Sequence, residues 1–447
     1  MNSPSSSFLV FVTFNSSCAA DFRFSVGASG EMAARGAKTA GRRFGKISTD
    51  VIRINVAGTR YYVVANAAAE LGMAASSDDG ATDCNVYWID GPVPLERYLE
   101  LRSYQKINHF PGMGEISRKD ALARNIQRMR KENRREYNFY PGTWVLPADH
   151  GVLSQHTARL RRRRQRKTFI VKPHHGSMGN GIYLTQSPDA ILPSEKAIVQ
   201  EYLDKPFLLD GFKCDLRIYV LVTSCKPLRI LVFKDGLVRL STERYSPPSD
   251  FNLEQMCMHL TNYSINRHSA SFDTDERDDR GSKRTLSSFM VWLHKTGHNV
   301  VELWAKIHDI IVKTLILAYP HILHSCTVSR HGHLPNGKSQ FFEILGFDVL
   351  LDHTLQPWVL EVNRSPSFGT DADLDLHIKT AVIRDALKLA NISLSDKLTE
   401  EACQRQASRG DLNLTPATPT PDNTTSLLNK LMLQQRKQAG ELQRRSD

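Results

Sequence analysis

The sequence predicts an α+β fold in which antiparallel sheets are flanked by helices. Apolar residues alternate with polar ones along 211–240 and 341–363, which is the period of β-strands. In 301–319 and 374–389 they recur every three to four residues instead, and so form a stripe along one side of a helix. Segments of both kinds therefore share one chain.

Length and charge narrow the class of protein. The 447 residues are enough for two or three subdomains with sizeable cores. The 58 Lys and Arg against 47 Asp and Glu give a formal charge of +11, and the isoelectric point is near 9.3. This surplus favours an acidic partner, such as nucleic acid, an anionic membrane or an acidic protein surface. The seven cysteines form no CxxC pair, so we expect a reducing compartment without disulfides or a zinc site.

The two ends of the chain differ in composition from the part between them. Residues 1–48 are rich in Ser, Ala and Gly, and we expect them to be disordered or poorly ordered. The apolar run 8–14 is short and lacks a preceding basic region, so we do not expect a signal peptide. No apolar run approaches the length of a membrane span. We expect 395–447 to be a flexible basic tail, in which 425–444 could form a helix on binding a partner.

The later alternating segment is a hairpin that gathers three oxygen-bearing side chains. Pairing Leu351 with Trp358 places Asp348 opposite Glu361, and Asn363 follows two residues later on the same face. Buried carboxylates without partners are costly, and a hard cation satisfies several oxygens at once. Two interpretations remain open: a Mg²⁺ site completed by nucleotide phosphates, or a carboxylate that pairs with a lysine or arginine.

A glycine-rich turn follows an apolar strand that ends in Lys172. Gly176, Gly179 and Gly181 leave backbone N–H groups free to approach phosphate oxygens, and the lysine can reach the same phosphates. No helix follows the turn, so it is neither a Walker A loop nor a Rossmann fingerprint. The turn alone is therefore weak evidence for phosphate binding.

Charged side chains lie within the earlier alternating segment. Lys213, Asp215 and Arg217 share one face of a strand, because side chains two residues apart point the same way. They either line a site or mark an edge strand that faces water, and Arg239 has the same two interpretations. The uninterrupted basic run 161–167 is either a solvated loop or a contact for an acidic partner. No aromatic residues interleave it, so a stacking platform for nucleic acid is not supported.

A series of motifs follows one order along the chain: QKINHFPGM, YNFYPGTWVLP, the IVKP glycine-rich turn, GFKCDLRIYVLVTS, MHLTNYSIN, GSKRTLSS, ILGFDVLLD and LEVNRSPSF. Together these motifs resemble the tubulin tyrosine ligase-like family, and most of all its polyglutamylase branch. The resemblance runs from about Ile52 to Ile392. It implies an ATP-grasp fold within 49–394, with subdomains 49–160, 161–240 and 241–394.

The resemblance also implies roles for individual residues. The residues expected to bind ATP are Lys172, Met178, Gly179, Gln200, Glu201, Tyr202, Leu203, Lys213, Asp215, Thr261 and Asn262. The residues expected to bind Mg²⁺ are Asp348, Glu361 and Asn363. The residues expected to hold free L-glutamate are Arg239, Tyr263, Ser264 and Lys283. Those expected to act in catalysis are Lys172, Lys213, Arg239 and Glu361.

The activity implied by the resemblance is ligation of free L-glutamate to glutamates in tubulin tails. The acceptor carboxylate would attack the γ-phosphate of ATP, and the amine of glutamate would then attack the resulting acyl phosphate. Arg239 would grip a glutamate carboxylate through two parallel hydrogen bonds. The positive charge of the protein suits the acidic tubulin tail. We expect a monomer whose partners are tubulin tails and microtubules, and we expect no binding to nucleic acid or to membranes. We expect it in the cytoplasm and cytoskeleton, at a cilium, flagellar axoneme or basal body.

Three departures from the family pattern leave alternatives open. The glycine-rich turn carries Met178 and Asn180, Cys214 replaces a Phe, and Arg364 stands where His is common. Arg364 leaves open whether glutamate branches are started or lengthened. One alternative is a related ligase that uses glycine or a non-tubulin acceptor, although Arg239 argues against glycine. Another is a microtubule-binding protein whose catalysis is weakened by the changes in the turn.

Overall fold

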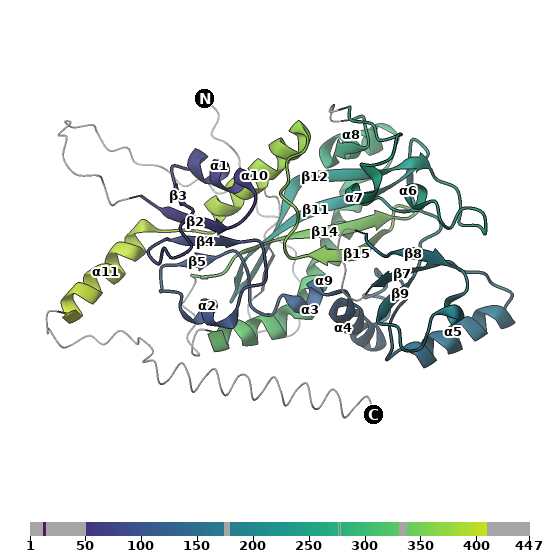
Figure 1. The fold of residues 1–447 in the computed structure, drawn as a ribbon, viewed down its shortest axis with the longest axis horizontal. Helices are drawn as coiled ribbons and strands as arrows, with labels where there is room; N and C mark the ends of the chain where they lie inside the picture. The colour runs from purple at the N-terminus through teal and green to yellow at the C-terminus, as the bar shows by residue number, and fades with distance from the viewer. Residues whose placement is uncertain are drawn as a thin grey trace.

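The computed structural model confirms the α+β class. It describes residues 12–14, 51–173, 179–275, 277, 279–329 and 338–408, with side chains of the last helix to 405. Three sheets with helices packed against them make up this part of the chain (Figure 1). No helix in it combines the length and apolarity needed to cross a membrane. The helix expected at 425–444 lies outside the described residues.

The N-terminal sheet is parallel, which corrects the prediction that all sheets are antiparallel. Its strand order is β3-β2-β4-β5. The parallel pairing of β2 with β3 requires a crossover, and a helix supplies it. The elements are β2 (Arg53–Gly58), α1 (Tyr62–Glu70), β3 (Ala74–Ser76), β4 (Val86–Ile89), α2 (Leu95–Leu99) and β5 (Lys106–Ile107).

The second sheet is antiparallel in the order β6-β9-β7-β8. Helix α5 packs on it through Leu153, which shares a core with Trp144 and Phe169. Because β6 and the start of α5 precede residue 161, this unit begins earlier than the predicted central subdomain. The elements are α3 (Gly114–Ser117), α4 (Lys119–Glu132), β6 (Thr143–Val145), α5 (His150–Arg162), β7 (Phe169–Pro173), β8 (Tyr183–Thr185), the 3₁₀ turn η1 (Pro188–Ala190) and β9 (Ala197–Glu201).

The third sheet follows the order β1-β12-β11-β14-β15, with β10 beside β11 and β13 beside β12. It joins the two alternating segments and so crosses the predicted boundary at residue 240. It also includes a strand from 1–48, where we expected little order. The elements are β1 (Val12–Phe14), β10 (Leu208–Leu209), β11 (Phe212–Cys225), β12 (Leu228–Arg244), α6 (Met256–His259), α7 (Tyr263–Asn266), β13 (Lys283–Thr285), α8 (Leu286–Lys295), α9 (Val300–Ser329), β14 (Glu343–Leu351), β15 (Pro357–Asn363) and α10 (Asp373–Leu389).

The register of the β14–β15 hairpin confirms one predicted pair and corrects the other. Asp348 lies opposite Glu361, as predicted. Trp358 lies opposite Leu350 and not Leu351, because a register shift after Asp348 leaves one extra residue in β15. The bulge therefore moves the apolar end of the hairpin by one residue and keeps the carboxylates in register.

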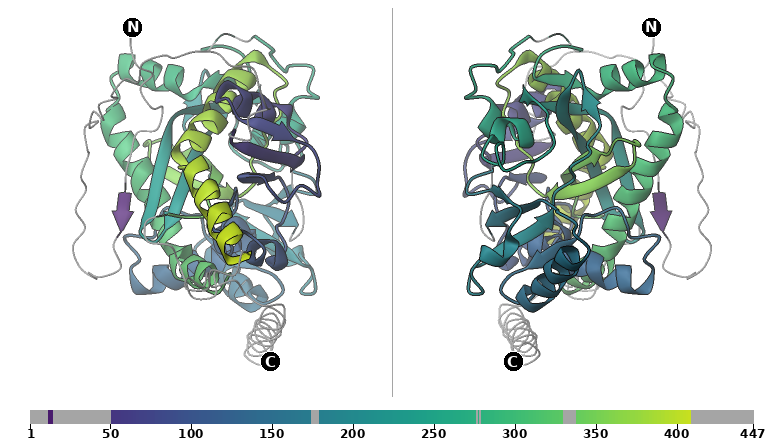
Figure 2. Two further views of the ribbon diagram at one scale, coloured as in Figure 1. Left: turned by 90° about the vertical axis from the view of Figure 1, so that its left-hand side faces the viewer. Right: turned by 90° about the vertical axis from the view of Figure 1, so that its right-hand side faces the viewer.

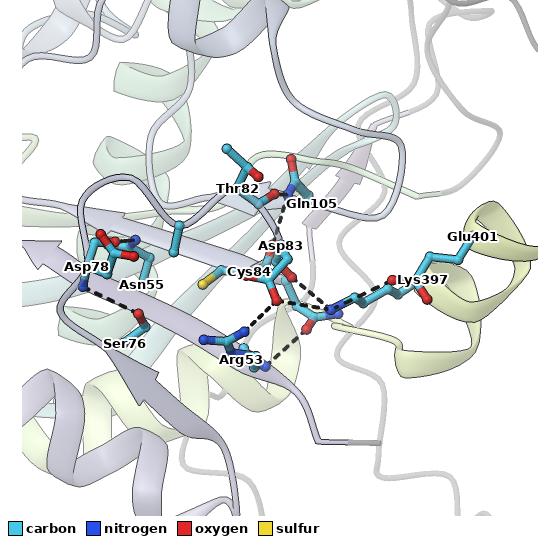
Figure 3. A network of polar contacts seen from close by, with 12 residues as sticks. Arg53, Asn55, Ser76, Asp78, Thr82, Asp83, Cys84, Gln105, Lys397 and Glu401 are labelled. Atoms are coloured by element: carbon cyan, nitrogen blue, oxygen red, sulfur yellow. Dashed lines mark hydrogen bonds and ion pairs between the residues drawn. The ribbon is translucent and has the colours of Figure 1, made fainter. Parts of the chain in front are cut away.

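Helix α11 (Leu394–Ser408) corrects the start of the predicted flexible tail at residue 395. In the left view of Figure 2, α10 and α11 run one after the other beside the N-terminal sheet. Lys397 is buried and donates to the carbonyl oxygen of Asp83 at 2.8 Å, and Arg53 forms an ion pair with the same aspartate (Figure 3). The first turns of the tail are therefore docked on the N-terminal sheet.

Candidate active site

A cleft lies between the second and third sheets. Strands β7 and β9 supply one wall, and β11, β12, β14 and β15 supply the other. Apolar, charged and uncharged polar side chains line it, as a site for a nucleotide requires. The predicted site residues in its lining are Lys172, Gln200, Glu201, Tyr202, Leu203, Lys213, Asp215, Arg239, Thr261, Asn262, Asp348 and Glu361.

The cleft also contains residues that sequence reasoning missed. The alternation of β-strands could have found two of them, because Ile170 lies two residues before Lys172 and Leu350 two residues after Asp348. No comparable signal pointed to His259. The lining residues without a predicted role are Pro141, Ile170, Ile182, His259, Leu260, Leu350 and Leu360.

Lys172 is held in the cleft by a neutral partner. Its Nζ donates to Oε1 of Gln200 at 2.9 Å, and the Gln200 amide in turn donates to Thr143 Oγ1 at 2.9 Å. Burial lowers the pKa of Lys172, an effect that the charge of Glu361 opposes. An amide satisfies one of three ammonium donors without neutralising the charge, so the lysine keeps the capacity to bind an anion.

Lys213 belongs to a buried hydrogen-bonded group with Tyr202 and His259. Its Nζ donates to the Tyr202 hydroxyl at 2.9 Å and to the His259 carbonyl oxygen at 2.8 Å. The His259 ring contacts the same hydroxyl at 3.1 Å and the Asn252 carbonyl oxygen at 3.0 Å. Burial lowers the pKa of Lys213 to about 7 and that of His259 to about 4. At neutral pH the histidine is therefore uncharged and Lys213 is close to its titration midpoint.

We expect nucleotide binding to consume protons above pH 7. A polyphosphate next to Lys213 favours its charged form and so raises its lowered pKa. At about pH 8.5 the complex must therefore take up a proton, and the affinity for a non-hydrolysable ATP analogue falls as the pH rises from about 7 to about 9. Calorimetric titration in buffers with different ionisation enthalpies measures this uptake directly.

The matched variant is Lys213→Arg, because a guanidinium stays charged throughout this pH range. It should lose the proton uptake. A binding enthalpy of the parent protein that is independent of the buffer at about pH 8.5 would contradict the lowered pKa of Lys213.

Four charged side chains form a row on the cleft face of the third sheet. Arg217 donates from Nε to Asp348 Oδ1 at 2.6 Å and from Nη2 to Oδ2 at 3.1 Å. Arg239 donates from Nε to Asp215 Oδ1 at 2.9 Å, and its Nη2 lies 3.0 Å from Asp348 Oδ2. Because β11 is an inner strand of its sheet and Asp215 is buried, the water-facing interpretation of this strand is wrong.

The pKa values of the two aspartates in this row are shifted in opposite directions. Burial raises the pKa of Asp215, and the charge of Arg239 only partly offsets it. Burial also raises the pKa of Asp348, but Arg217 and Arg239 outweigh this effect and hold it well below the usual range. Asp348 is therefore ionised at neutral pH. The arginine-paired interpretation of the hairpin carboxylate applies to it, alongside its place next to Glu361.

The predicted Mg²⁺ ligands lie together at the end of the hairpin. The Asn363 amide nitrogen is 3.2 Å from Glu361 Oε1 and 3.5 Å from Asp348 Oδ2. The described residues contain no group of three or more His, Cys, Asp or Glu that could hold a metal ion. Two carboxylates and one carboxamide nevertheless fit Mg²⁺, which binds few protein oxygens and completes its shell with phosphates and water.

The residues predicted to hold glutamate divide into two groups. Arg239 lines the cleft, whereas Tyr263, Ser264 and Lys283 are absent from its lining. Lys283 lies directly opposite Arg239 across the β12–β13 pair. Its Nζ is 2.6 Å from Asp375 Oδ2 and 3.5 Å from the centre of the Tyr263 ring. The structure thus places Lys283 and Tyr263 together, next to the arginine at the rim of the cleft.

The glycine-rich turn is described only from Gly179 onward, so Met178 lies outside the described residues. Gly179 has a φ of +81°, and a Cβ there would lie 2.7 Å from Ile265 Cδ1. Both the backbone conformation and the space therefore require glycine. The same Cβ would lie 3.5 Å from Cγ of Asn262, which lines the cleft, so Gly179 lies next to the cleft lining.

Two further side chains with predicted roles also make contacts away from the centre of the cleft. The Glu201 carboxylate lies 3.1 Å from both His156 Nε2 and Lys167 Nζ, on the side of α5. Arg364 lies 3.7 Å from the buried carboxylate of Glu343 and lines a separate hollow beside α9. An effect of Arg364 on an acceptor would therefore come from that side of the hairpin.

Comparisons with known proteins agree on one family. A sequence model described as the tubulin-tyrosine ligase family matches residues 97–399. Tubulin polyglutamylase TTLL7 of Xenopus tropicalis is 49% identical over 360 residues, which are 80% of this chain and 40% of the relative. The human TTLL7 is 48% identical over 354 residues, 79% of this chain and 40% of the relative. The human tubulin polyglutamylase TTLL6 is 50% identical over 354 residues, which are 79% of this chain and 39% of the relative. The chain thus spans about 40% of the length of these curated relatives.

Proposed function

Because the chain belongs to the tubulin-tyrosine ligase family, we propose that it is an ATP- and Mg²⁺-dependent tubulin polyglutamylase. It ligates free L-glutamate to glutamate residues of tubulin tails through an acyl phosphate. Relatives that carry this name match most of the chain at about half identity. Its partners are tubulin tails and microtubules, and it acts as a monomer in the cytoplasm, on the cytoskeleton and at cilia, axonemes or basal bodies.

One observation carries the proposal: a single cleft brings lysines, an arginine and the hairpin carboxylates to within reach of one ligand. Lys172 and Lys213 come from the two opposite walls. Apolar side chains such as Ile170 and Leu350 lie between the charged ones. This combination suits a nucleotide, whose base is apolar and flat and whose phosphates are anionic.

The residues of the cleft divide the work of phosphoryl transfer. Lys172 and Lys213 place fixed positive charge against the triphosphate and stabilise the charge that develops as the acceptor carboxylate attacks the γ-phosphate. Asp348, Glu361 and Asn363 would hold Mg²⁺, which supplies neutralisation of the phosphate oxygens. The attack forms the acyl phosphate and releases ADP. The amine of glutamate then attacks the acyl carbonyl and phosphate leaves, while the ammonium group gives up two of its three protons and keeps one as the amide N–H.

Arg239 binds the incoming amino acid with the part of its guanidinium that the aspartates leave available. Its Nε and Nη2 are engaged with Asp215 and Asp348, so the two parallel bonds expected for a carboxylate are already used by Asp215. Nη1 is the remaining donor group. Lys283, directly opposite on β13, adds a second cation at the same rim, and Asp375 is its counter-ion. A dicarboxylic amino acid matches this pair of cations better than glycine does.

We expect the protein to add glutamate, and not glycine, to tubulin when ATP is present. Mass spectrometry of tubulin tails after incubation with each isotope-labelled amino acid measures donor, acceptor and chain length together. A mass increase with glycine, or with glutamate in the absence of ATP, would contradict the proposed reaction. ATP turnover without any mass increase on tubulin would favour a non-tubulin acceptor. Binding to tubulin without ATP turnover and without a mass increase would favour a catalytically weakened microtubule-binding protein.

A further inference from the structure

The C-terminal end of α5 is a strongly basic surface on the outside of the second sheet. Residues 159–167 read RLRRRRQRK, so seven of these nine positions carry a positive charge, and all seven side chains are exposed. Figure 1 shows α5 at the outer edge of the molecule, on the far side of the second sheet from the third. The surface therefore lies outside the cleft.

Ion pairs account for fewer than half of these charges. Arg161 pairs with Asp189, Arg166 with Asp250 and Lys167 with Glu201. Within the described part of the chain no ion pair involves the other four, which we call the α5 arginine surface. Its members are Arg159, Arg162, Arg163 and Arg164.

Arg164 occupies a position at which an arginine costs folding stability. The amide of Gln165 donates to the Leu160 carbonyl oxygen at 3.0 Å and the amide of Arg164 to that of Arg161 at 2.9 Å, which is a Schellman motif. The residue at this position adopts φ of +53°, a conformation for which glycine is the usual choice. Favourable interaction with the helix dipole explains cations in the last turn. It does not explain an arginine in the left-handed position beyond it.

An exposed aromatic side chain lies beside the basic surface. Asp250, which pairs with Arg166, precedes Phe251, and that phenyl ring is 95% exposed. Carboxylates at Asp189 and Asp250 are interspersed with the arginines. A continuous phosphate backbone would be repelled by them, whereas a polypeptide with separated carboxylates and apolar residues can avoid them.

We propose that the α5 arginine surface docks a glutamate-rich segment of the acceptor protein, away from the residue being modified. This inference rests on the proposed function, because that function requires an acceptor rich in glutamate. The surface raises the local concentration of the acceptor and leaves the chemistry to the cleft. Its contribution is electrostatic and therefore weakens as salt is added.

The test compares two quadruple variants with the same change of charge. The first replaces Arg159, Arg162, Arg163 and Arg164 by glutamine. The control replaces Arg128, Lys131, Arg134 and Arg135 by glutamine, because these are exposed cations on and after α4 for which the described residues provide no ion pair. Fluorescence anisotropy with a labelled oligo-glutamate peptide, over a series of salt concentrations and without ATP, measures docking. We expect about a 10-fold loss of affinity and a flatter salt dependence for the first variant, and a change of less than about 2-fold for the control.

A single variant separates docking from folding. Arg164→Gly places glycine in the left-handed position, so we expect a higher unfolding temperature together with weaker oligo-glutamate binding. If the stability rises and oligo-glutamate binding is unchanged, Arg164 does not contribute to the α5 arginine surface. For the quadruple variants, an equal loss of oligo-glutamate affinity in both would show that net charge alone causes the effect, and this would overturn the proposal.

Two further measurements identify the partner class. The first measures binding of an oligouridylate of equal length. If it binds as tightly as oligo-glutamate, and the α5 quadruple variant loses affinity for both probes equally, the choice of an acidic polypeptide is overturned. If the parent protein adds no glutamate to tubulin but the α5 variant still loses oligo-glutamate binding, the docking surface stands and the proposed function fails. Because docking is measured without ATP, the two failures are distinguishable.

Discussion

Replacing Glu361 by glutamine is expected to reduce glutamate ligation by about 10²–10³-fold or more, with the fold unchanged. The substitution keeps the size of the side chain but removes one negative charge from the three proposed Mg²⁺ ligands. Glu361 lies opposite Asp348 and accepts a hydrogen bond from Asn363 at 3.2 Å. An amide in its place binds a hard cation more weakly, so phosphate charge is less well neutralised in the transition state.

The experiment needs a binding measurement beside the activity. Binding of a non-hydrolysable ATP analogue, titrated against Mg²⁺, should require a higher Mg²⁺ concentration in Glu361→Gln. The matched control is Glu243→Gln, which changes an exposed carboxylate near the end of β12, outside the cleft lining. Parental activity and parental Mg²⁺ dependence in Glu361→Gln would show that the metal assignment is wrong.

The face on which the hairpin carboxylates lie could be predicted because side chains alternate along strands. That rule paired Asp348 with Glu361 correctly, although the assumed pairing of Leu351 with Trp358 was wrong by one residue. A bulge changes pairing without leaving a signal in the apolar pattern, since the extra residue, like its neighbours, is compatible with a strand. The carboxylates were nevertheless placed correctly, because the bulge lies between them and Trp358 and offsets the one-residue error in the assumed pair.

Contacts between segments distant in the chain could not be predicted in the same way. The group formed by Tyr202, Lys213 and His259 joins residues up to 57 positions apart, and only the packing of the second sheet on the third brings them together. His259 had no predicted role because its motif alone does not indicate what its ring contacts. The docking of α11 through Lys397 was missed for a similar reason, since a polar helix resembles a tail until its lysine is seen to be buried.

The family resemblance and the residue patterns contributed different information. Alternation placed Lys213, Asp215 and Arg217 on one face but left open whether that face met water. The resemblance selected a nucleotide site, and the position of β11 inside its sheet agrees with that choice. Neither indicated that Arg217 would pair with Asp348, because this pairing depends on β14 lying beside β11.

Replacing Asp348 by asparagine is expected to destabilise the protein by about 3–5 kcal/mol, which is a larger effect than most single substitutions have. Asp348 is the carboxylate partner of Arg217 and a second partner of Arg239, in a site that is almost fully buried. Without it the guanidinium of Arg217 keeps its charge and loses its counter-ion. Denaturant unfolding at neutral pH measures the difference.

The pH dependence of that difference follows from the pKa of Asp348. Arg217 and Arg239 overcome the opposing effect of burial and hold the folded-state pKa well below the unfolded value of about 4. The stabilisation is therefore complete above pH 4 and is lost as the pH falls toward the folded-state pKa. The parent and Asp348→Asn should accordingly differ most at neutral pH and converge in acid.

A double variant decides whether the loss comes from the stranded charge. If Arg217 is left unpaired in Asp348→Asn, replacing Arg217 by methionine as well should recover part of the lost stability, because a buried pair replaced on both sides leaves no uncompensated charge. Methionine also keeps an unbranched, flexible aliphatic chain at this position. The opposite outcome is additivity, in which the free energy of unfolding of the double variant is lower than that of Asp348→Asn by the full cost of Arg217→Met alone. Additivity would mean that the two side chains contribute independently and that the ion pair does not stabilise the sheet.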